Sequence, residues 1–335
     1  MSVSVLMTTY NGEKYIFEQL NSIYQQTHSP NEVVIYDDRS NDNTVSIINN
    51  FIKERKLNNW FLFINRENKG WQRNFIDAMK KVSGEIIFLC DQDDIWFEDK
   101  IENMVQVMKK NHNIKCLSGN IVTIDDSGEL FENKNGYIVG NNTNKVTKVN
   151  FNKKFNAITL LGCTMCLRKE VADIISDINV KNFSHDAQVC RLSTILDGLY
   201  LLDRKVIKYR IHQNNTSGIA SGVGIGSSNL NKRKSTIAAN IQWLEALMQY
   251  YFENSKIPDF KIEIISKTIE LQKMRYDFLT TRKLIDFIRL YKYRGYYSNI
   301  SMLIGDLAYC YGINKITGKG LWFIKSAIKG LSRNS

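Results

Sequence analysis

The chain of 335 residues is long enough for two domains of about 150 residues each, or for one elaborated α/β domain. Its apolar fraction of 43% and charged fraction of 24% exclude a disordered polymer, and only 2 prolines exclude collagen-like and proline-rich chains. No apolar run approaches the roughly 18 to 20 residues that cross a bilayer, and the first residues lack the basic segment of a secretory signal. We therefore expect an intracellular protein that is soluble or bound to a surface.

Strand-like and helix-like segments alternate through the first 110 residues. Short apolar runs predict strands, and apolar residues at helical spacing between them predict helices. The predicted order is strand 3–8, helix 15–26, strand 33–36, helix 44–55, strand 61–64, helix 71–82, strand 85–90 and helix 99–110. This alternation is typical of an α/β fold with a mainly parallel sheet covered by helices on both faces. Ligands of such sheets bind beyond the carboxyl ends of the strands.

Polar residues follow three of the predicted strands, at residues 8–11, 37–38 and 91–94. The five carboxylates in these segments would repel one another unless a divalent cation or a hydrogen-bonding ligand shared the site. Asp91 and Asp93 offer hard oxygen ligands, which suit Mg²⁺ or Mn²⁺ held jointly with substrate phosphates. Aspartates at strand ends also cap helices, so capping is the alternative role.

The sequence lacks the defining motifs of three other α/β classes. No Gly-x-Gly-x-x-Gly follows the first strand, which excludes a dinucleotide-binding Rossmann domain. The phosphate-binding P-loop and the Gly-x-Ser-x-Gly turn of α/β-hydrolases are also absent. The glycine-rich run at residues 222–226 follows no strand-to-helix turn, and we expect a flexible loop there.

Six cysteines are scattered along the chain. Cys163 and Cys166 have the spacing of a metal-binding pair, but no second pair completes a zinc site. They lie in an apolar, strand-like run, in which alternation places the two thiols on opposite faces. We expect all six cysteines to be buried structural residues.

The net charge of +11 is concentrated in the last third of the chain. Residues 1–225 hold 27 Lys and Arg against 26 Asp and Glu, whereas residues 226–335 hold 18 against 8 and are rich in aromatic residues. Basic amphipathic helices of this kind suit an anionic membrane surface, and nucleic acid would satisfy the same charge. A helical subdomain with solvated lysines is the plain alternative. We expect a domain at residues 1–225 and a basic helical region at 226–335 that contacts membrane or another copy, and no nucleic acid.

Four motifs in the first hundred residues resemble those of the family 2 glycosyltransferases. They are the segments 3–13, 34–44, 68–74 and 84–94, in the order and spacing of that family. The resemblance does not cover the chain beyond about residue 225. It implies the GT-A fold, in which one α/β domain binds a nucleotide-sugar donor and a divalent metal ion, Mn²⁺ or Mg²⁺. Arg39 stands where the family usually has Gly.

The resemblance also implies roles for individual residues. Asp93 would bind the metal ion that bridges the donor diphosphate, and Asp186 would be the general base, with helix capping as its alternative role. The nucleoside, its base and its ribose would be bound by Thr8, Tyr10, Glu13, Asp38, Arg73 and Asp91.

Two later segments, 183–186 and 209–215, resemble a bacterial branch similar to rhamnosyltransferases. On that resemblance, His212 would be a metal ligand or a diphosphate donor, and Arg210 would hold phosphate, although a lone histidine is more often structural. Gly162 lies in a run that resembles the strand beneath the acceptor cleft, where it would let a sugar approach closely. His185 receives no role.

Together these resemblances imply an inverting glycosyltransferase. We expect transfer of L-rhamnose from dTDP-rhamnose to a polyprenyl-diphosphate-linked oligosaccharide, for a bacterial capsule or O-antigen, by a cytoplasmic enzyme peripherally bound to the inner face of the cell membrane. The alternatives are a UDP-hexose-dependent enzyme of the same fold, a nucleotidyltransferase, and a catalytically inactive glycan-binding module. The nucleotidyltransferase is disfavoured because no glycine-rich basic loop follows the first strand.

Overall fold

The computed structural model describes residues 1–130, 141–180, 182–212, 215, 230–254, 257–297 and 300–311. The chain divides into two compact units, residues 1–151 with 158–225, and residues 152–157 with 226–335. Each unit is described by itself below. The loop expected at residues 222–226 lies outside the described residues.

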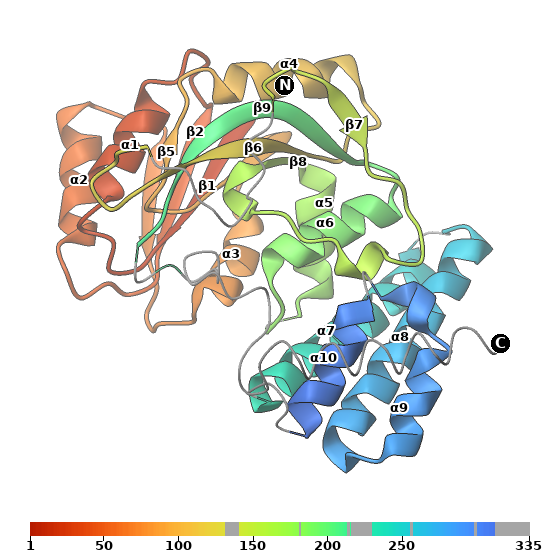
Figure 1. Ribbon diagram of the computed structural model, residues 1–335. Helices are drawn as coiled ribbons and strands as arrows, with labels where there is room; N and C mark the ends of the chain where they lie inside the picture. Colours follow the sequence, from red (N-terminus) through yellow and green to blue (C-terminus); the bar gives the residue numbers. More distant parts are fainter. Residues whose placement is uncertain are drawn as a thin grey trace. The chain divides into compact units, whose positions relative to one another are not determined.

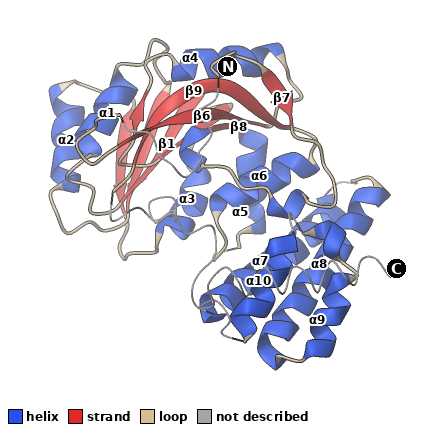
Figure 2. Cartoon of the chain, in the orientation of Figure 1, coloured by secondary structure: helices blue, strands red, loops and turns tan. Residues whose placement is uncertain are grey.

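The first unit contains, within the described residues, a nine-stranded mixed sheet (Figures 1 and 2). Its order is β3-β2-β1-β4-β8-β6-β9-β5, and β7 pairs with β9. Strands β3, β2, β1 and β4 are parallel, and β8 runs antiparallel to β4 and β6. The strands are β1 Val3–Thr9, β2 Glu32–Asp37, β3 Trp60–Ile64, β4 Ile86–Cys90, β5 Ile95–Trp96, β6 Cys116–Ile124, β7 Val146–Lys148, β8 Met165–Arg168 and β9 Leu199–Arg210.

Helices cover both faces of this sheet, with α1, α2 and α4 on one side and α3, α5 and α6 on the other (Figure 1). The helices are α1 Ile16–Tyr24, α2 Thr44–Glu54, α3 Trp71–Met79, α4 Lys100–Lys110, α5 Lys169–Ile178 and α6 His185–Ile195. All eight predicted elements are present, with ends that differ by at most three residues. The largest difference is in α3, where Lys81 N–H bonds to the Ala78 carbonyl in a tighter final turn. The predicted α/β fold with a mainly parallel sheet is confirmed.

The two central strands are buried along their whole length. Every residue of β1 and β4 is buried, as expected for parallel strands that have helices on both faces. Val5, Met7 and Phe88 lie in one core cluster with Leu20 of α1 and Met104 of α4. The polar residues after these strands therefore continue directly from the buried core of the unit.

The cysteine pair is arranged differently from the prediction. Residues Gly162–Thr164 form a 3₁₀ turn, and β8 begins only at Met165, so strand alternation does not extend from Cys163 to Cys166. Both side chains lie in the same core cluster, so the prediction of opposite faces is wrong. All six cysteines are buried and free, as predicted.

Arg39 adopts the backbone conformation that glycine would allow. Its φ of 64° is in the left-handed region, which costs a side-chain-bearing residue about 1 kcal/mol. Its guanidinium donates a hydrogen bond of 2.8 Å to the Arg66 carbonyl. The turn after β2 thus keeps the glycine-type geometry although the residue differs from the family pattern.

The second unit is helical, as expected for the basic region. Its helices are α7 Leu230–Asn254, α8 Asp259–Thr281, α9 Leu284–Tyr291 and α10 Ile300–Cys310. Leu271, Phe278, Leu290 and Leu303 form the centre of its core. None of the helices in the described part of the chain is both long and apolar enough to cross a membrane.

A buried carboxylate joins three of these helices. Asp306 of α10 is fully buried, and its two oxygens accept hydrogen bonds of 2.7 Å from the Nε atoms of Arg233 in α7 and Arg275 in α8. Arg275 makes a second bond to the same carboxylate at 3.1 Å. Because each guanidinium is largely buried, removal of the carboxylate would leave two buried cations without their counter-charge.

We expect Asp306→Asn to destabilise the helical unit by about 3 to 5 kcal/mol, the range for breaking a buried ion pair. Urea denaturation of the full chain, followed by circular dichroism, measures this loss. Asp277→Asn, at an exposed position of α8, is the control and should change stability little. Equal stability of both variants would contradict a structural role for the Asp306 carboxylate.

Candidate active site

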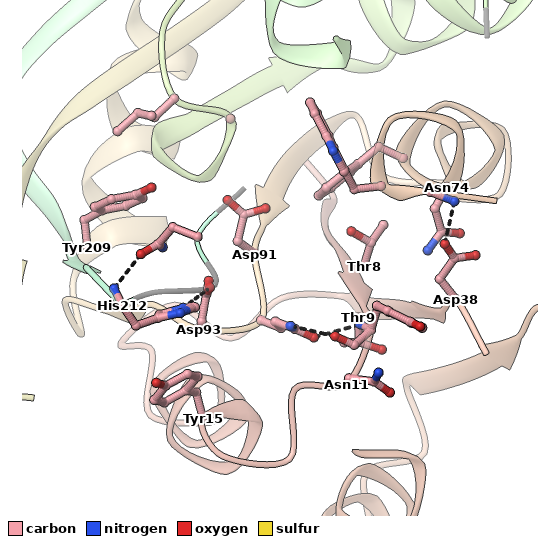
Figure 3. A pocket seen from close by; sticks show the side chains of 18 of the residues that line it. Thr8, Thr9, Asn11, Tyr15, Asp38, Asn74, Asp91, Asp93, Tyr209 and His212 are labelled. Atoms are coloured by element: carbon pink, nitrogen blue, oxygen red, sulfur yellow. Dashed lines mark hydrogen bonds and ion pairs between the residues drawn. The ribbon is translucent and has the colours of Figure 1, made fainter. Parts of the chain in front are cut away.

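A cavity of about 1140 Å³ lies in the first unit, beyond the carboxyl ends of β1, β2 and β4. Figure 3 shows Asp93 and His212 on one side of it and Asp38 and Asn74 on the other, with Thr8 and Asp91 between them. The cavity occupies the position that the parallel strand order predicts for a ligand. Seven of the ten predicted site residues line it: Thr8, Tyr10, Asp38, Asp91, Asp93, Asp186 and His212.

Arg210 is not one of the residues that line the cavity. Its side chain is only 1% exposed, and its guanidinium pairs with Glu18 and donates to the main-chain carbonyls of Asp93, Asp125 and Asp126. The expectation that Arg210 holds phosphate is corrected, because its donors are directed at protein oxygens. The buried guanidinium instead holds the loops at residues 93–94 and 125–126 through hydrogen bonds to their main-chain carbonyls.

Glu13 and Arg73 also lie outside the lining of the cavity. The Glu13 carboxylate accepts hydrogen bonds from the main-chain N–H and the side-chain amide of Asn43, at 2.9 and 2.8 Å. Arg73 pairs through Nε with Asp77, one turn further along α3, at 2.8 Å. Both side chains therefore bond to elements of the wall, and neither is among the residues that line the cavity.

Asp38 is a buried acceptor for the loop that precedes α3. Its oxygens accept hydrogen bonds from the main-chain N–H groups of Lys69 and Gly70, at 2.9 and 2.8 Å, and from the Asn65 amide at 2.8 Å. The same Asn65 amide donates to Asn74, which lines the cavity. Sequence reasoning missed both as site residues. The pairing of β2 with β3 brings Asn65 beside Asp38, and Asn74 of α3 is held there by its hydrogen bonds to Asn65 and to the Tyr36 carbonyl.

Gln92 is a second residue that sequence reasoning missed. Its side-chain oxygen accepts a hydrogen bond of 2.8 Å from Tyr10 N–H, and its amide donates to the Tyr10 carbonyl at 3.0 Å. Gln92 thereby extends the pairing of β1 and β4 beyond the ends of both strands. A Cβ at Gly12 would lie 2.3 Å from the Gln92 oxygen, so a side chain at residue 12 would displace the Gln92 amide from Tyr10. The glycine directly after the Tyr10-Asn11 pair was the available signal.

Asp93 and His212 come together although they are far apart in the sequence. Their Oδ2 and Nε2 atoms are 2.9 Å apart, and both side chains line the cavity (Figure 3). The His212 ring lies 4.9 Å from the ring of Tyr15, and its main-chain N–H donates to the Asn215 side chain. A carboxylate and an imidazole at this separation fit two adjacent positions around a metal ion such as Mn²⁺.

A second group that could hold a metal ion lies deeper. One ligand atom each from Asp91, Asp94 and Cys163 falls within 4.8 Å of the others. Burial, with the charges of Asp93 and Asp186 adding to it, raises the pKa of Asp91 to about 7. Burial also raises the pKa of Asp94 and of the Cys163 thiol. A protonated thiol is a poor ligand for Mg²⁺ or Mn²⁺, so the pair Asp93 and His212 fits a hard divalent ion better.

Asp186 lies in the first turn of α6, where the positive end of the helix dipole favours a carboxylate. Its Oδ1 is 2.6 Å from Nε2 of His185. The His185 ring stacks on Phe75, with centroids 4.0 Å apart, and meets the edge of the Trp71 ring at 5.7 Å. Two aromatic rings therefore hold the imidazole that contacts the carboxylate.

Gly162 leaves space for Asp186. A Cβ at this position would lie 2.3 Å from Asp186 Oδ1 and 3.0 Å from His185 Nε2. The sequence expectation was that this glycine admits a sugar. In the structure Gly162 lines the cavity. The atoms that a side chain at this position would meet are those of Asp186 and His185.

Comparison with known proteins shows the family. The family described as Glycosyl transferase family 2 matches residues 4–175, which is half of the chain. This chain belongs to glycosyltransferase family 2. The alternatives of a nucleotidyltransferase and an inactive binding module are therefore set aside, and the chain is a glycosyltransferase.

Two relatives illustrate the range of sugars in this family. The chain is 31% identical over 227 residues to the dTDP-rhamnosyl transferase RfbG of Shigella flexneri. That match covers 63% of this chain and 73% of RfbG. It is 34% identical over 125 residues to the Escherichia coli enzyme WfgD, a UDP-Glc:alpha-D-GlcNAc-diphosphoundecaprenol beta-1,3-glucosyltransferase. That match covers 37% of this chain and 47% of WfgD.

A solved structure shares the fold. Staphylococcus aureus TarS 1–349 in complex with UDP-GlcNAc aligns with a TM-score of 0.55, over 89% of this chain and 93% of that chain. Sequence identity is 16%, so this likeness concerns the fold alone. The GT-A fold expected from the sequence is confirmed.

We expect Gly162→Ala to lower sugar transfer at least about tenfold, because the added methyl group displaces the Asp186 carboxylate. Affinity for nucleoside diphosphate should stay within about twofold, since the hydrogen bonds that hold Asp38 and Tyr10 on the nucleoside side of the cavity do not involve Gly162. Initial rates and calorimetric titration measure the two effects. Gly295→Ala is the control, because a Cβ there would meet nothing within 4 Å. Unchanged transfer by Gly162→Ala would show that the position of Asp186 does not matter.

Proposed function

We propose that this glycosyltransferase transfers L-rhamnose from dTDP-rhamnose, with inversion, to a polyprenyl-diphosphate-linked oligosaccharide in the assembly of a bacterial capsule or O-antigen. The observation that carries the proposal is a single cavity lined by Asp93 and His212 on one side and by Asp186 at the start of α6. Likeness to RfbG over most of that enzyme supports rhamnose as the sugar. Likeness to WfgD, whose name specifies a diphosphoundecaprenol-linked substrate, supports the acceptor class.

The donor nucleoside would bind where the strand ends meet. Thr8, Tyr10 and Asp38 line this part of the cavity, and Asp91 lies between Thr8 and Asp93 (Figure 3). Asp38 already accepts three hydrogen bonds from the protein, which fixes its orientation before a base arrives. A side chain that is already fixed loses little conformational entropy when a ligand binds, which favours binding.

Asp93 and His212 would hold the divalent cation, Mn²⁺ or Mg²⁺. When bound, that ion supplies positive charge that stabilises the departing nucleoside diphosphate. The chain contributes the position of the two ligands, since Arg210 fixes the main chain of Asp93 and Asn215 fixes the main chain of His212.

Asp186 would act as the general base. In an inverting transfer the acceptor hydroxyl attacks the anomeric carbon in one step, so its proton must be removed as the new bond forms. The contact of Oδ1 with His185 orients the carboxylate, and the side chain remains 22% exposed to the cavity. Asp186 thus combines access to an acceptor with a fixed orientation.

A UDP-hexose-dependent enzyme is the second candidate. The solved TarS structures contain UDP or UDP-GlcNAc, and WfgD is named for UDP-glucose. The two candidates differ in the nucleotide that they predict, which makes nucleotide binding the first experiment.

Calorimetric titration with dTDP, UDP and their sugar derivatives, with and without Mn²⁺, should show metal-dependent binding that favours dTDP-rhamnose. Asp93→Asn should remove the dependence of donor binding on Mn²⁺, because it leaves His212 without its partner carboxylate as a metal ligand. Asp173→Asn, whose exposed carboxylate pairs with Lys169 on α5, is the control. A preference for UDP would replace rhamnose by the second candidate. If Asp93→Asn kept the same dependence on Mn²⁺, the assignment of the metal ion to Asp93 and His212 would be wrong.

Asp186→Asn should keep donor affinity and lower turnover on the order of 10²-fold or more, because the amide cannot accept the hydroxyl proton. Transfer of radiolabelled sugar into a bacterial lipid extract measures turnover, and calorimetry measures donor binding. Asp173→Asn again serves as the control. Turnover like that of the unaltered protein would place the base elsewhere.

We also propose that the enzyme works at the inner face of the cell membrane, where a polyprenyl-linked acceptor is anchored. The net charge of residues 226–335 supports this, since 18 basic residues face 8 acidic ones. Pairing with a second copy of the chain is the alternative use of this region.

A further inference from the structure

The short helix α9 has two apolar faces, of which only one packs against other residues in the described part of the chain. Phe287 and Leu290 belong to the core of the helical unit, where α9 contacts α8 and α10. Leu284, Ile285 and Ile288 are 60%, 53% and 63% exposed. At about 100° per residue, these three side chains share one arc of the helix, separate from the packed face. We refer to Leu284, Ile285 and Ile288 as the α9 apolar face.

Exposed basic residues flank the α9 apolar face in the sequence. Five exposed basic residues lie within the segment 282–294, and its single acidic residue, Asp286, is half-buried. The Asp286 carboxylate accepts a hydrogen bond from Thr281 and lies 3.4 Å from Arg289. The local charge is therefore strongly positive. The basic residues are Arg282, Lys283, Arg289, Lys292 and Arg294.

The length of α9 restricts how it can meet a membrane. Eight residues span about 12 Å at 1.5 Å per residue, which is less than half of a hydrocarbon core about 30 Å thick. A helix of this size with exposed aliphatic residues and flanking cations can lie in the plane of the membrane interface. The aliphatic side chains would then reach the acyl chains, and the cations would reach anionic head groups.

Other occupants fit this surface less well. A two-fold contact between copies would bring one basic border against the same basic border of the partner, which is repulsive. Nucleic acid would match the charge, but Leu and Ile offer no planar ring on which a base can stack. Charge complementarity together with the aliphatic character favours an anionic lipid surface.

We propose that the α9 apolar face inserts into an anionic lipid surface and is the principal membrane contact of this enzyme. The inference deepens the proposed function, on which it rests for the location of a lipid-linked acceptor. It assigns the contact to three named residues outside the cavity, so it can fail while the assignment of the donor site stands.

The test is co-sedimentation of the full chain with vesicles made of an equimolar mixture of phosphatidylglycerol and phosphatidylcholine. The variant Leu284→Gln/Ile285→Gln/Ile288→Gln should bind at least about tenfold more weakly, because three aliphatic side chains no longer insert among the lipid acyl chains. The matched control is Phe252→Gln/Phe260→Gln, which removes large exposed apolar side chains (74% and 56%) from α7 and α8. The control should bind like the unaltered chain.

A charge variant tests the second half of the proposal. Lys283→Glu/Lys292→Glu should weaken binding to the mixed vesicles several-fold and make the remaining binding less sensitive to salt. Thermal unfolding and calorimetric binding of nucleoside diphosphate should be unchanged in every variant, which separates loss of membrane contact from loss of fold or donor site. Equal vesicle binding by the α9 triple variant would overturn the proposal, as would absence of vesicle binding by the unaltered chain. A sedimentation-velocity shift from dimer to monomer in that variant would instead assign the face to a second copy.

Discussion

Strand β1 pairs in parallel with β2 on one side and with β4 on the other, and this double pairing fixes the candidate active site. The register places Thr8 opposite Tyr36, Thr9 opposite Asp37, and Met7 opposite Cys90. The residues that follow the three strands therefore emerge at one edge of the sheet. Because β1 and β4 are fully buried, a shift of register would expose the core, so the relative positions of Tyr10, Asp38 and Asp91 are strongly determined.

The concentration of carboxylates at this edge requires compensation. Asp37 accepts hydrogen bonds from Thr9 and Ser40, and Asp38 accepts them from the loop before α3, so neither carboxylate needs a cation. Asp91 and Asp93 lack comparable shells of main-chain donors among the contacts of the described residues, and the pKa of Asp91 rises to about 7. The acidic residues thus separate into a group that shapes the walls and a group that is available for chemistry.

Buried guanidinium groups have structural roles in both units. Arg210 in the first unit pairs with Glu18 and bonds to three carbonyls, whereas Arg233 and Arg275 in the second unit share the carboxylate of Asp306. In each case a desolvated cation is tolerated because several acceptors surround it. The net positive charge of the second unit therefore resides on its other basic residues, among them the exposed ones beside the α9 apolar face.

The sequence by itself determined the alternation of strands and helices, the edge of the sheet at which the cavity lies, and the family. Apolar periodicity and the polar residues at 8–11, 37–38 and 91–94 report these features locally, so no tertiary information was needed. The tertiary structure decided which polar residues face the cavity. Arg210 and Glu13 have the right residue types, but their partners Glu18 and Asn43 come from other elements and draw them away from the cavity. The roles of Gln92 and Gly162 also depend on contacts across the fold, with Tyr10 and Asp186, which no local pattern contains. Burial and long-range hydrogen bonding, which depend on the packed chain, separate a ligand-binding side chain from a structural one of the same type.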